Sequence, residues 1–473
     1  MTSTSSKERR IAVIGGGITG LTAAWTLQRA GLKPLVFEQA GRAGGNVGAF
    51  QQNGWLHELG PNSMLENTPE IAHFISQLGL EARRLYAPAT ASKRYIVRRG
   101  RLMPAPTSPF SFATTSLFSL RAKLRLLGEP WRPRAPENQE ESVAQFVRRR
   151  LGQEFLDYAV NPFVGGVYAG DPTRLSLRHA FPKLHAIEQS DGSLFRGALK
   201  RRNTTGAPKG RMFSFPNGLA EVTTALAHEL GDDLKLRTRV QVIRPDADQW
   251  EIIAESNGVR TSCRVDVVIC ALPADGLAAL HVEGHEDPQP FASLRGIEHP
   301  SVASVLMGYR RADVSHALDG FGFLVPEVEP GQILGTLFSS TLFPNRAPDG
   351  HVALTSFLGG SRQPLLVQED DETLKELVQS ELARFLGVRA GPVFTHIQRW
   401  PRAIPQYALG YQRFKDLMTA AERTMPGLLI GGNARDGISL THCIASGQRV
   451  ALAAIRHLQN SDSASALSQT SSA

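Results

Sequence analysis

Three glycines near the start of the chain have the spacing of a phosphate-binding loop. Gly15, Gly17 and Gly20 follow a short apolar run over residues 11–14, and apolar residues at helical spacing come after them. In such a strand–loop–helix unit the first glycine permits a tight turn, the second lets the backbone approach a pyrophosphate, and the third lets the helix pack on the strand. A pyrophosphate would then lie at the helix N-terminus. The predicted contacts are Gly15, Gly16, Gly17, Ile18, Thr19 and Gly20.

An acidic residue lies where this unit needs an acceptor for a ribose. Residues 35–37 form a second apolar run, and Glu38 and Gln39 follow it. The Glu38 carboxylate can accept hydrogen bonds from ribose hydroxyls. The glycine pattern alone is a weak signal, because Gly-rich turns also occur by chance. Strand, glycines, helix, second strand and carboxylate together predict a dinucleotide site.

A turn with two further glycines follows this unit. Arg42 precedes Gly44, Gly45 and Asn46, and an arginine before a glycine pair can bring charge and open backbone to cofactor phosphates. A solvated turn is the alternative, and it would be favoured if the turn stood alone. The turn resembles the R-x-G-G signature of amine-oxidase-like flavoproteins, which favours FAD over NAD. Arg42, Gly45 and Asn46 are therefore predicted cofactor contacts.

The far end of the chain repeats a strand–glycine–helix arrangement. Residues 428–430 form an apolar strand, Gly431 and Gly432 open it, and residues 437–440 lead into a helix. A helix N-terminus after glycines offers backbone N–H groups to an anion or to ring carbonyls. Because cofactor contacts occur at both ends, the cofactor domain must be discontinuous. The predicted contacts here are Asn433, Ile438, Ser439 and Leu440.

The middle of the chain changes character twice. Strand signals over 232–244 and 264–272 are typical of the returning part of the cofactor domain, where Val240 is either a backbone contact to the adenine end, as in the superfamily, or a core residue. Alternating segments over 301–357 predict an antiparallel sheet that roofs a cavity. Residues 373–386 fit an amphipathic helix, and 107–202 carry helical stretches and few strand signals.

The chain is basic, with 52 Lys and Arg against 44 Asp and Glu and a formal net charge of +8. Such an excess favours anionic partners, but no recognisable nucleic-acid-binding module accompanies it. Apolar and basic residues lie next to each other in the helical segment. This pattern fits a helix that docks on an anionic membrane, and it also fits a packed subdomain with a solvated basic face. The apolar members are Phe110, Phe112, Leu117, Phe118 and Leu120, and the basic ones are Arg121, Lys123, Arg125, Arg132 and Arg134.

The sequence also bounds the compartment. No run of eighteen apolar residues occurs, so we expect no transmembrane helix. The polar first ten residues lack the apolar core of a signal peptide. Three cysteines without a CxxC pair favour a reducing compartment. These observations predict a cytoplasmic protein.

Longer motifs carry a resemblance to one family. The motifs are Glu58-Leu-Gly-Pro-Asn62-Ser63, Lys93-Arg94-Tyr-Ile-Val, Pro162-Phe-Val-Gly-Gly166-Val-Tyr-Ala-Gly-Asp171, Gly320-Phe-Gly-Phe-Leu324-Val-Pro, residues 334–348, Trp400-Pro-Arg-Ala-Ile-Pro-Gln-Tyr407 and Gly431-Gly-Asn433. Through these motifs the chain resembles the oxygen-dependent protoporphyrinogen oxidases, and especially their plant-like branch, over residues 10 to about 458.

The resemblance implies a function. FAD would be held without a covalent link, and protoporphyrinogen IX would be oxidised to protoporphyrin IX in tetrapyrrole biosynthesis. Three hydrides would pass from meso carbons to flavin N5, and oxygen would reoxidise the flavin to give hydrogen peroxide. The helical segment would attach peripherally to the membrane. A homodimer is left open, and nucleic acid is not expected as a partner.

The resemblance also assigns residues to the substrate. A porphyrinogen is an apolar macrocycle with carboxylate side chains, so its site should be an apolar slot with a cation at one end. The guanidinium of Arg94 matches a propionate, although a surface arginine is the plain alternative. The predicted substrate contacts are Asn62, Arg94, Gly166, Leu324, Leu337 and Phe357; the remaining predicted cofactor contacts are Gly60, Pro61, Asn62, Ser63, Val240 and Trp400. Without the resemblance the three apolar residues would be taken as core, Gly166 could equally be a simple turn glycine, and no general base is nominated.

The predicted organisation is an α/β fold. A discontinuous Rossmann-like FAD-binding domain would carry an antiparallel-sheet substrate domain and an α-helical membrane-binding domain. The boundaries are 8–89, 237–290 and 400–458 for the FAD-binding domain, 90–107, 206–236 and 291–399 for the substrate domain, 108–205 for the helical domain and 459–473 for a Ser/Ala-rich disordered tail.

Three other functions stay open. Coproporphyrinogen III differs from protoporphyrinogen IX at two side chains and is an alternative substrate. Another flavin oxidase, for amines or carotenoids, is a second alternative, although Gly432-Asn-Ala-Arg435 departs from the Gly-Thr-Glu run of amine oxidases. A non-catalytic flavoprotein that holds porphyrin is the third. Asn62 stands where some family members carry Arg and the plant-like branch carries Asn, and Tyr411 stands where many members carry His; both leave the substrate contacts around them open.

Overall fold

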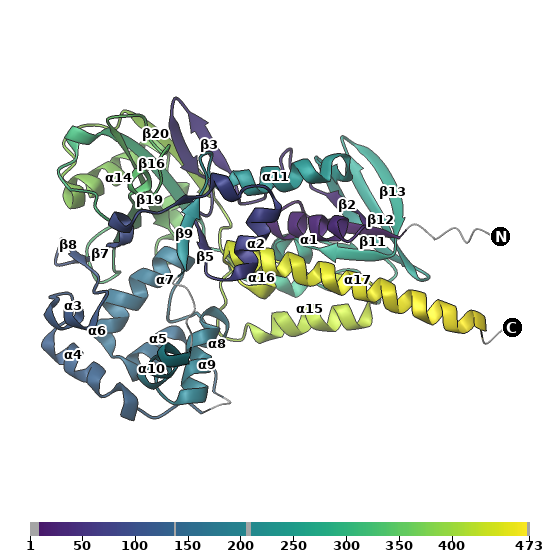
Figure 1. The fold of residues 1–473 in the computed structure, drawn as a ribbon, viewed down its shortest axis with the longest axis horizontal. Coiled ribbons are helices and arrows are strands. Elements are labelled where there is room, and N and C mark those ends of the chain that lie inside the picture. Colours follow the sequence, from purple (N-terminus) through teal and green to yellow (C-terminus); the bar gives the residue numbers. More distant parts are fainter. Residues whose placement is uncertain (1–8, 137–138, 205–209, 471–473) are drawn as a thin grey trace.

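A parallel sheet of five short strands forms the centre of one half of the molecule (Figure 1). The computed structural model describes residues 9–136, 139–204 and 210–470. The strands, in spatial order, are β10 (Leu234–Lys235), β2 (Lys33–Phe37), β1 (Arg10–Ile14), β14 (Val267–Cys270) and β21 (Leu428–Ile430), and all neighbours are parallel. One sheet is thus assembled from segments hundreds of residues apart.

Alternation along β1 explains why both faces of this sheet are covered. Ile11 and Val13 pack in a core with α1 (Ile18–Arg29) and α17 (Leu440–Thr470), which run side by side in Figure 1. Ala12 and Ile14 share a core with a second sheet, since successive side chains of a strand point to opposite faces. The second sheet has the order β13 (Val259–Val265), β12 (Gln249–Ser256), β11 (Thr238–Asp246) and β15 (His281–Val282).

A seven-stranded sheet builds the other half of the molecule. Its order is β20 (Phe394–Trp400), β16 (Val302–Arg310), β19 (His351–Gly359), β18 (Ile333–Leu337), β17 (Gly322–Leu324), β7 (Arg94–Arg98) and β8 (Arg101–Pro104). The predicted antiparallel character holds except between β17 and β7, which are parallel, because β7 enters from a distant part of the chain. Val305, Met307 and Leu382 belong to the core under α14 (Asp371–Leu386), so the opposite face of the sheet is turned toward the rest of the molecule.

Helices fill the segment at the lower left of Figure 1. They are α3 (Pro109–Thr114), α4 (Leu120–Leu127), α5 (Val143–Arg150), α6 (Gln153–Phe155), α7 (Asn161–Tyr168), α8 (Leu177–Ala180), α9 (Pro182–Asp191) and α10 (Leu194–Thr204). Arg150 is fully buried between Glu129 and Glu188, an ion-paired cluster that ties α5 to α9. No helix among the described residues is long and apolar enough to cross a bilayer.

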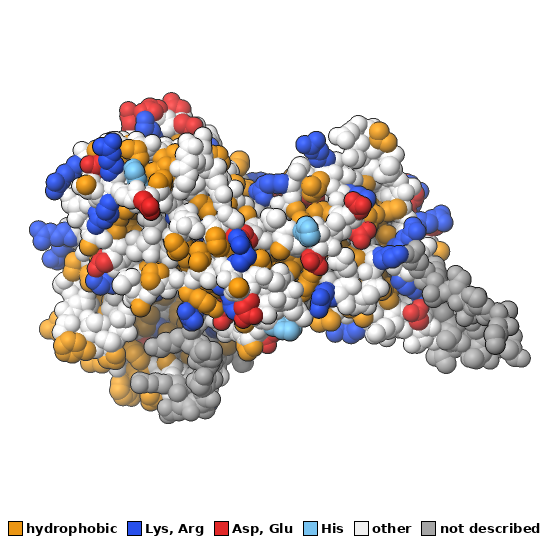
Figure 2. All heavy atoms as spheres, turned by 45° about the horizontal axis from the view of Figure 1, so that its top comes forward, with side chains coloured by type: hydrophobic (Ala, Val, Ile, Leu, Met, Phe, Trp, Pro, Cys, Tyr) orange, Lys and Arg blue, Asp and Glu red, His pale blue; other side chains and the backbone are white. Residues whose placement is uncertain are grey.

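The apolar residues that the sequence grouped into one cluster in this segment fall into a buried set and an exposed set in the structure. Leu117 and Phe118 are buried against Ile96 and Phe155, so they are core residues and not part of an exposed face. Phe110 and Leu120 are 78% and 72% exposed. Hydrophobic side chains gather at the lower left of Figure 2, the end that carries this segment in Figure 1.

The remaining strands and α-helices are smaller elements placed around these sheets. They are the hairpin β3 (Ala49–Gln52) and β4 (Trp55–Glu58), the sheet of β5 (Met64–Glu66), β9 (Arg211–Ser214) and β6 (Leu85–Tyr86), and the helices α2 (Pro69–Gln77), α11 (Ala220–Leu230), α12 (Ala274–Ala278), α13 (Ser339–Leu342), α15 (Gln412–Thr424) and α16 (Asn433–Asp436). The tail expected to be disordered continues α17 to Thr470. An established helix adds residues without a new nucleation cost, and alanine favours this extension.

Candidate functional site

The glycine loop opens space in front of α1. Gly15 has φ +108°, and a Cβ there would lie 2.7 Å from the carbonyl oxygen of Ala271, so the turn requires glycine. A Cβ on Gly20 would lie 1.9 Å from the carbonyl oxygen of Gly15, whereas one on Gly17 would meet nothing within 4 Å. Gly17 is also the N-cap of α1, and no side chain caps this helix. Its first N–H groups are therefore available to an anion.

Glu38 lies at the end of β2 beside this loop. Its Oε2 accepts a 2.7 Å hydrogen bond from the backbone N–H of Gly16, and its Oε1 accepts one of 2.7 Å from Ala40. An ionised carboxylate has about four acceptor positions, so acceptor capacity remains for ribose hydroxyls. Gln39, the next predicted contact, is exposed.

The Arg42 turn packs directly on the glycine loop. The backbone N–H of Gly44 donates to the carbonyl of Gly16 at 2.8 Å, and a Cβ on Gly45 would lie 3.2 Å from the Cα of Gly17. Arg42 donates to the carbonyl oxygens of Ala43, Gly45 and Val47. Its guanidinium thus closes the turn, a role that the sequence analysis did not consider for it.

The loop after β4 meets both the turn and the seven-stranded sheet. A Cβ on Gly60 would lie 2.0 Å from the carbonyl oxygen of Asn46. The Asn62 side chain donates to the carbonyl of Gly60 at 3.1 Å. Trp400, at the end of β20, donates from Nε1 to the carbonyl of Leu59 at 2.6 Å. The predicted contacts Asn46, Gly60, Asn62 and Trp400 are therefore neighbours, and Pro61 and Ser63 lie in the same loop.

The C-terminal glycine segment completes this side of the site. Gly432 has φ +123°, and its N–H donates to Ser446 Oγ at 2.9 Å. Thr19 of α1 donates to the carbonyl of Cys443 in α17 at 3.2 Å, so the two terminal segments meet. The predicted contacts Asn433, Ile438, Ser439 and Leu440 lie between β21 and the first turn of α17. Val240 is half-buried at a β-bulge in β11 and packs against the core of the second sheet.

The predicted ring contacts share one face of the seven-stranded sheet. Leu324 is paired across the sheet with Gly335, which is paired with Phe357. Leu337 lies two residues beyond Gly335 on the same strand. Directly paired residues and residues two apart point to the same face, so Leu324, Leu337 and Phe357 are all on it. Trp400 is on it too, since Val302 lies opposite Trp400 and two residues from the partner of Phe357.

Arg94 and Gly166 border this face. Arg94 is paired with Gly322, two residues before Leu324, so it stands at the edge of the same face. It is exposed, and its guanidinium lies 5.2 Å from the centre of the Phe321 ring. Gly166, exposed on α7, is so close that a Cβ on it would lie 2.7 Å from the side chain of Leu324. The structure thus brings the predicted substrate contacts together around a face rich in apolar side chains.

A buried ion pair supports this region and was missed by the sequence analysis. Glu58 accepts from Arg346 Nη2 at 3.1 Å, from Ser214 Oγ at 3.2 Å and from the N–H of Leu219 at 3.0 Å. Burial raises the pKa of Glu58 to about 7, although Arg346 opposes the shift. The two partners are 288 positions apart in the sequence. The only sequence signal that could have pointed to them is that both lie inside family motifs. With Asn62, both line a small cavity.

Two tyrosines support the segment after β21. Tyr407 donates from its hydroxyl to the carbonyl of Asn433, and Tyr411 donates to that of Ala434 at 2.6 Å. Both rings are buried, and burial raises the pKa of Tyr411 above its ordinary range. Tyr411, whose departure from the family pattern left a substrate contact open, is here a residue that positions the backbone of Ala434, next to the predicted cofactor contact Asn433.

The family is settled by comparison with known proteins. Residues 18–455 match the model of flavin-containing amine oxidoreductases. The chain is 34% identical to protoporphyrinogen oxidase 2, chloroplastic/mitochondrial, of Arabidopsis thaliana, over 96% of this chain and 95% of that protein. The chain belongs to the protoporphyrinogen oxidase branch of this family. It is also 28% identical to coproporphyrinogen III oxidase of Bacillus subtilis, over 96% of this chain and 99% of that protein.

A solved structure agrees with the family. A protein of Exiguobacterium sp. 255-15, described as a protoporphyrinogen oxidase, superposes with a TM-score of 0.79 at 25% identity, over 96% of this chain and 99% of that one. The predicted resemblance and the α/β fold class are thereby confirmed. This flavin-containing oxidoreductase uses FAD, and the open, uncapped start of α1 beside Glu38 fits the cofactor's pyrophosphate and ribose. The individual contacts remain predictions.

Proposed function

We propose that this flavin oxidoreductase oxidises a porphyrinogen to the porphyrin, with protoporphyrinogen IX as substrate, in six electrons and with oxygen as the final acceptor. The observation that carries the proposal is the sheet face on which Leu324, Leu337 and Phe357 stand together, with Arg94 at its edge. An apolar face bordered by one cation suits a flat, apolar macrocycle with carboxylates on one side. The relatives named as protoporphyrinogen oxidases support the same substrate.

Each residue has a role in orienting the substrate. The three apolar side chains hold the ring and exclude water, while Arg94 fixes the propionate end by a charge-assisted hydrogen bond. Asn62 is held by the Gly60 carbonyl close to the Arg42 turn, where substrate and cofactor would meet. Bound FAD supplies a hydride acceptor and passes the electrons to oxygen. Three hydrides leave meso carbons in three rounds, each accompanied by loss of a proton, with imine–enamine rearrangement between rounds. In total four hydrogens leave the meso carbons and two leave the pyrrole nitrogens, which accounts for six electrons.

The test is turnover of the purified FAD-loaded protein. We expect porphyrin fluorescence to appear on addition of protoporphyrinogen IX, with three molecules of hydrogen peroxide for each porphyrin. Arg94→Ala should raise KM at least tenfold and leave the FAD content unchanged, because the lost charge-assisted bond is worth about 1.5–3 kcal/mol. Arg423→Ala, an exposed arginine on α15, is the matched control. Fluorescence absent from the wild type would refute the proposal.

We also propose that the protein attaches peripherally to a membrane through α3, α4 and the turn that follows. Leu120, Leu124, Leu127 and Trp131 recur at helical spacing, and all are at least 58% exposed, as is Phe110. This row can lie in the headgroup region with its apolar face buried.

Three of the basic residues near this row are hydrogen-bonded to the protein itself. Lys123 donates to the carbonyls of Ala113 and Thr115, Arg125 donates to that of Arg148, and Arg134 to that of Gln189. Apolar burial should therefore dominate, and added salt should weaken attachment little. Flotation with anionic phospholipid vesicles should recover the wild type, whereas L120S/L124S/L127S should stay with the soluble fraction. Leu452→Ser, at an exposed leucine on α17, should still float; co-flotation of the triple variant would contradict the assignment.

A further inference from the structure

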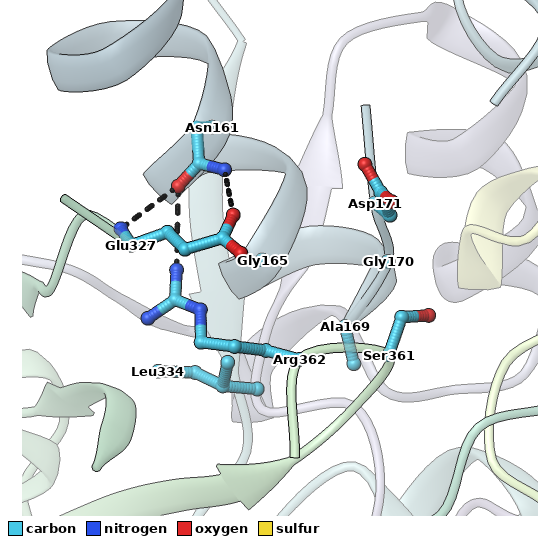
Figure 3. Close-up of a pocket in the computed structure, with 9 residues that line it drawn as sticks. All are labelled: Asn161, Gly165, Ala169, Gly170, Asp171, Glu327, Leu334, Ser361 and Arg362. Carbon is cyan, nitrogen blue, oxygen red and sulfur yellow. Dashed lines mark hydrogen bonds between the residues drawn. The ribbon is translucent and has the colours of Figure 1, made fainter. Parts of the chain in front are cut away.

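Arg362 is a half-buried cation with no ion-pair partner in the part of the chain that the structure describes. It follows β19, and its guanidinium points toward Asn161 of α7 (Figure 3). Nη1 donates to the carbonyl of Val325 at 3.1 Å, and Nη2 donates to Asn161 Oδ1 at 3.3 Å. Among the described residues, no carboxylate oxygen lies within 4.0 Å of its guanidinium nitrogens, the limit for an ion pair. Burial lowers the pKa of Arg362, so the charge is held there at a cost that an anionic ligand would offset.

Arg362 and Arg94 lie at opposite ends of the apolar face. Arg94 is paired with Gly322 at the start of β17, whereas Arg362 contacts the carbonyl of Val325 just beyond the end of that strand. At about 3.3 Å per residue, roughly 10 Å of strand separates these two positions. Leu324 stands between them. The separation is comparable with the width of a tetrapyrrole ring.

A small cavity of about 30 Å³ lies beside Arg362, between α7 and the seven-stranded sheet. It is large enough for a water molecule, which an entering carboxylate group could displace. Gly165 and Leu334 form its apolar wall, and a Cβ on Gly165 would lie only 3.8 Å from Arg362 Nη2. Gly165 therefore packs close to the guanidinium, and the next residue of α7, Gly166, lies against Leu324 of the apolar face.

Two carboxylates line the same cavity and are already engaged. Glu327 is exposed and accepts a 2.9 Å hydrogen bond from Asn161 Nδ2. Asp171 accepts from the N–H and the hydroxyl of Thr173, both at 2.7 Å. Glu327 is close enough to act on the charge of Arg362, so it should weaken an anion bound there without abolishing binding. Removing the charge of Glu327 should therefore strengthen anion binding at Arg362, whereas removing the charge of Arg362 should weaken it.

We propose that Arg362 forms a second carboxylate-binding subsite, at the end of the slot opposite Arg94. The inference rests on the proposed function and extends it to substrate choice. Coproporphyrinogen III carries propionates on all four rings and can engage both arginines at once. Protoporphyrinogen IX carries two propionates on neighbouring rings and can engage only one end. The subsite therefore makes this protein able to accept the tetracarboxylate, with a lower KM than Arg94 alone would give.

The test compares KM for the two porphyrinogens with the FAD-loaded protein. Arg362→Gln should raise KM for coproporphyrinogen III about ten- to hundredfold, the value of a charge-assisted hydrogen bond, and change that for protoporphyrinogen IX less than threefold. Arg362→Lys should recover part of the loss, and Glu327→Gln should lower KM for the tetracarboxylate. Arg423→Gln is the control for an arginine lost elsewhere.

The outcomes separate this inference from the proposed function. Equal effects of Arg362→Gln on both substrates, or no effect on either, would overturn the subsite while leaving porphyrinogen oxidation intact. A wild type that oxidises neither porphyrinogen would remove both. If Arg362→Gln loses FAD, the comparison moves to Arg362→Lys and Glu327→Gln, whose opposite shifts for coproporphyrinogen III the subsite requires. Fluorescence titration with coproporphyrin III and protoporphyrin IX should show the same selectivity without turnover.

Discussion

Replacing Arg346 with methionine should destabilise the junction between the β3–β4 hairpin and the seven-stranded sheet by an amount that depends on pH. Arg346 and Glu58 are 2% and 4% exposed. Methionine fills part of the space but leaves Glu58 with Ser214 Oγ and the N–H of Leu219 as donors. An uncompensated buried charge costs about 3–5 kcal/mol.

The pH dependence follows from the carboxyl group. Burial raises the pKa of Glu58 from 4.5 to about 7. A raised folded-state pKa gives stability that is complete below the unfolded-state pKa and is lost as pH rises through the folded-state value, about 3 kcal/mol over this range. Without Arg346 the folded-state pKa of Glu58 rises further. The penalty of Arg346→Met should therefore be small near pH 5, where Glu58 can take up a proton, and largest above about pH 8.

Thermal unfolding followed by circular dichroism measures this penalty. For a cooperative unit of 150–250 residues, a 3 kcal/mol loss corresponds to a fall in Tm of about 6–12 °C, expected at about pH 8.5 and much reduced at about pH 5. The double variant E58Q/R346M should recover most of the loss at high pH, because no buried charge remains. A fall in Tm that is equal at both pH values, or no recovery in the double variant, would refute the reasoning.

Three further changes test other parts of the structure. Gly15→Val should yield protein with less bound FAD, measured by flavin absorbance, because a side chain at φ +108° meets the Ala271 carbonyl; full occupancy would contradict the loop geometry. Trp400→Phe removes the bond to the Leu59 carbonyl and should cost about 1 kcal/mol in urea unfolding; an unchanged midpoint would show that this bond adds nothing. Asp370→Ala removes the N-cap of α14, which accepts from Thr373 at 2.8 Å, and should cost about 1 kcal/mol with FAD content unchanged; loss of FAD would show that α14 supports the cofactor side.

Local chemistry made the cofactor side predictable. Gly15, Gly17 and Gly20 lie within one turn and the start of one helix, so their spacing in the sequence is enough to predict the loop that the structure shows. The same holds for the apolar strands of the central sheet, whose burial on both faces is visible in β-branched runs. The sequence predicted that the domain is discontinuous but not the order of its strands, because no local pattern indicates that β14 lies between β1 and β21.

Pairings over long distances were not predictable. Glu58 and Arg346 become partners only after the hairpin and the sheet have met. Likewise, Leu117 and Leu120 have the same side chain and each follows a serine, yet one is buried and the other is 72% exposed. Whether each leucine is buried depends on the positions of Ile96 and Phe155 in the folded protein, which pack against Leu117. The parallel entry of β7 beside β17 has the same cause, since strand order is a property of the assembled fold.

The contact between α1 and α17 has a consequence for how the protein is made. A Cβ on Gly447 would lie 2.5 Å from the carbonyl oxygen of Thr19, so the two helices touch at the level of the backbone. A chain leaves the ribosome from its N-terminus, and the glycine loop is therefore synthesised long before its partner segment exists. Until β21 and α17 emerge, β14 has an open edge, and the predicted cofactor contacts Asn433, Ile438, Ser439 and Leu440 have not been synthesised. If these residues hold the flavin as we expect, its capture waits for the completed chain, and a transcript cut short before residue 428 should yield a protein that does not retain it.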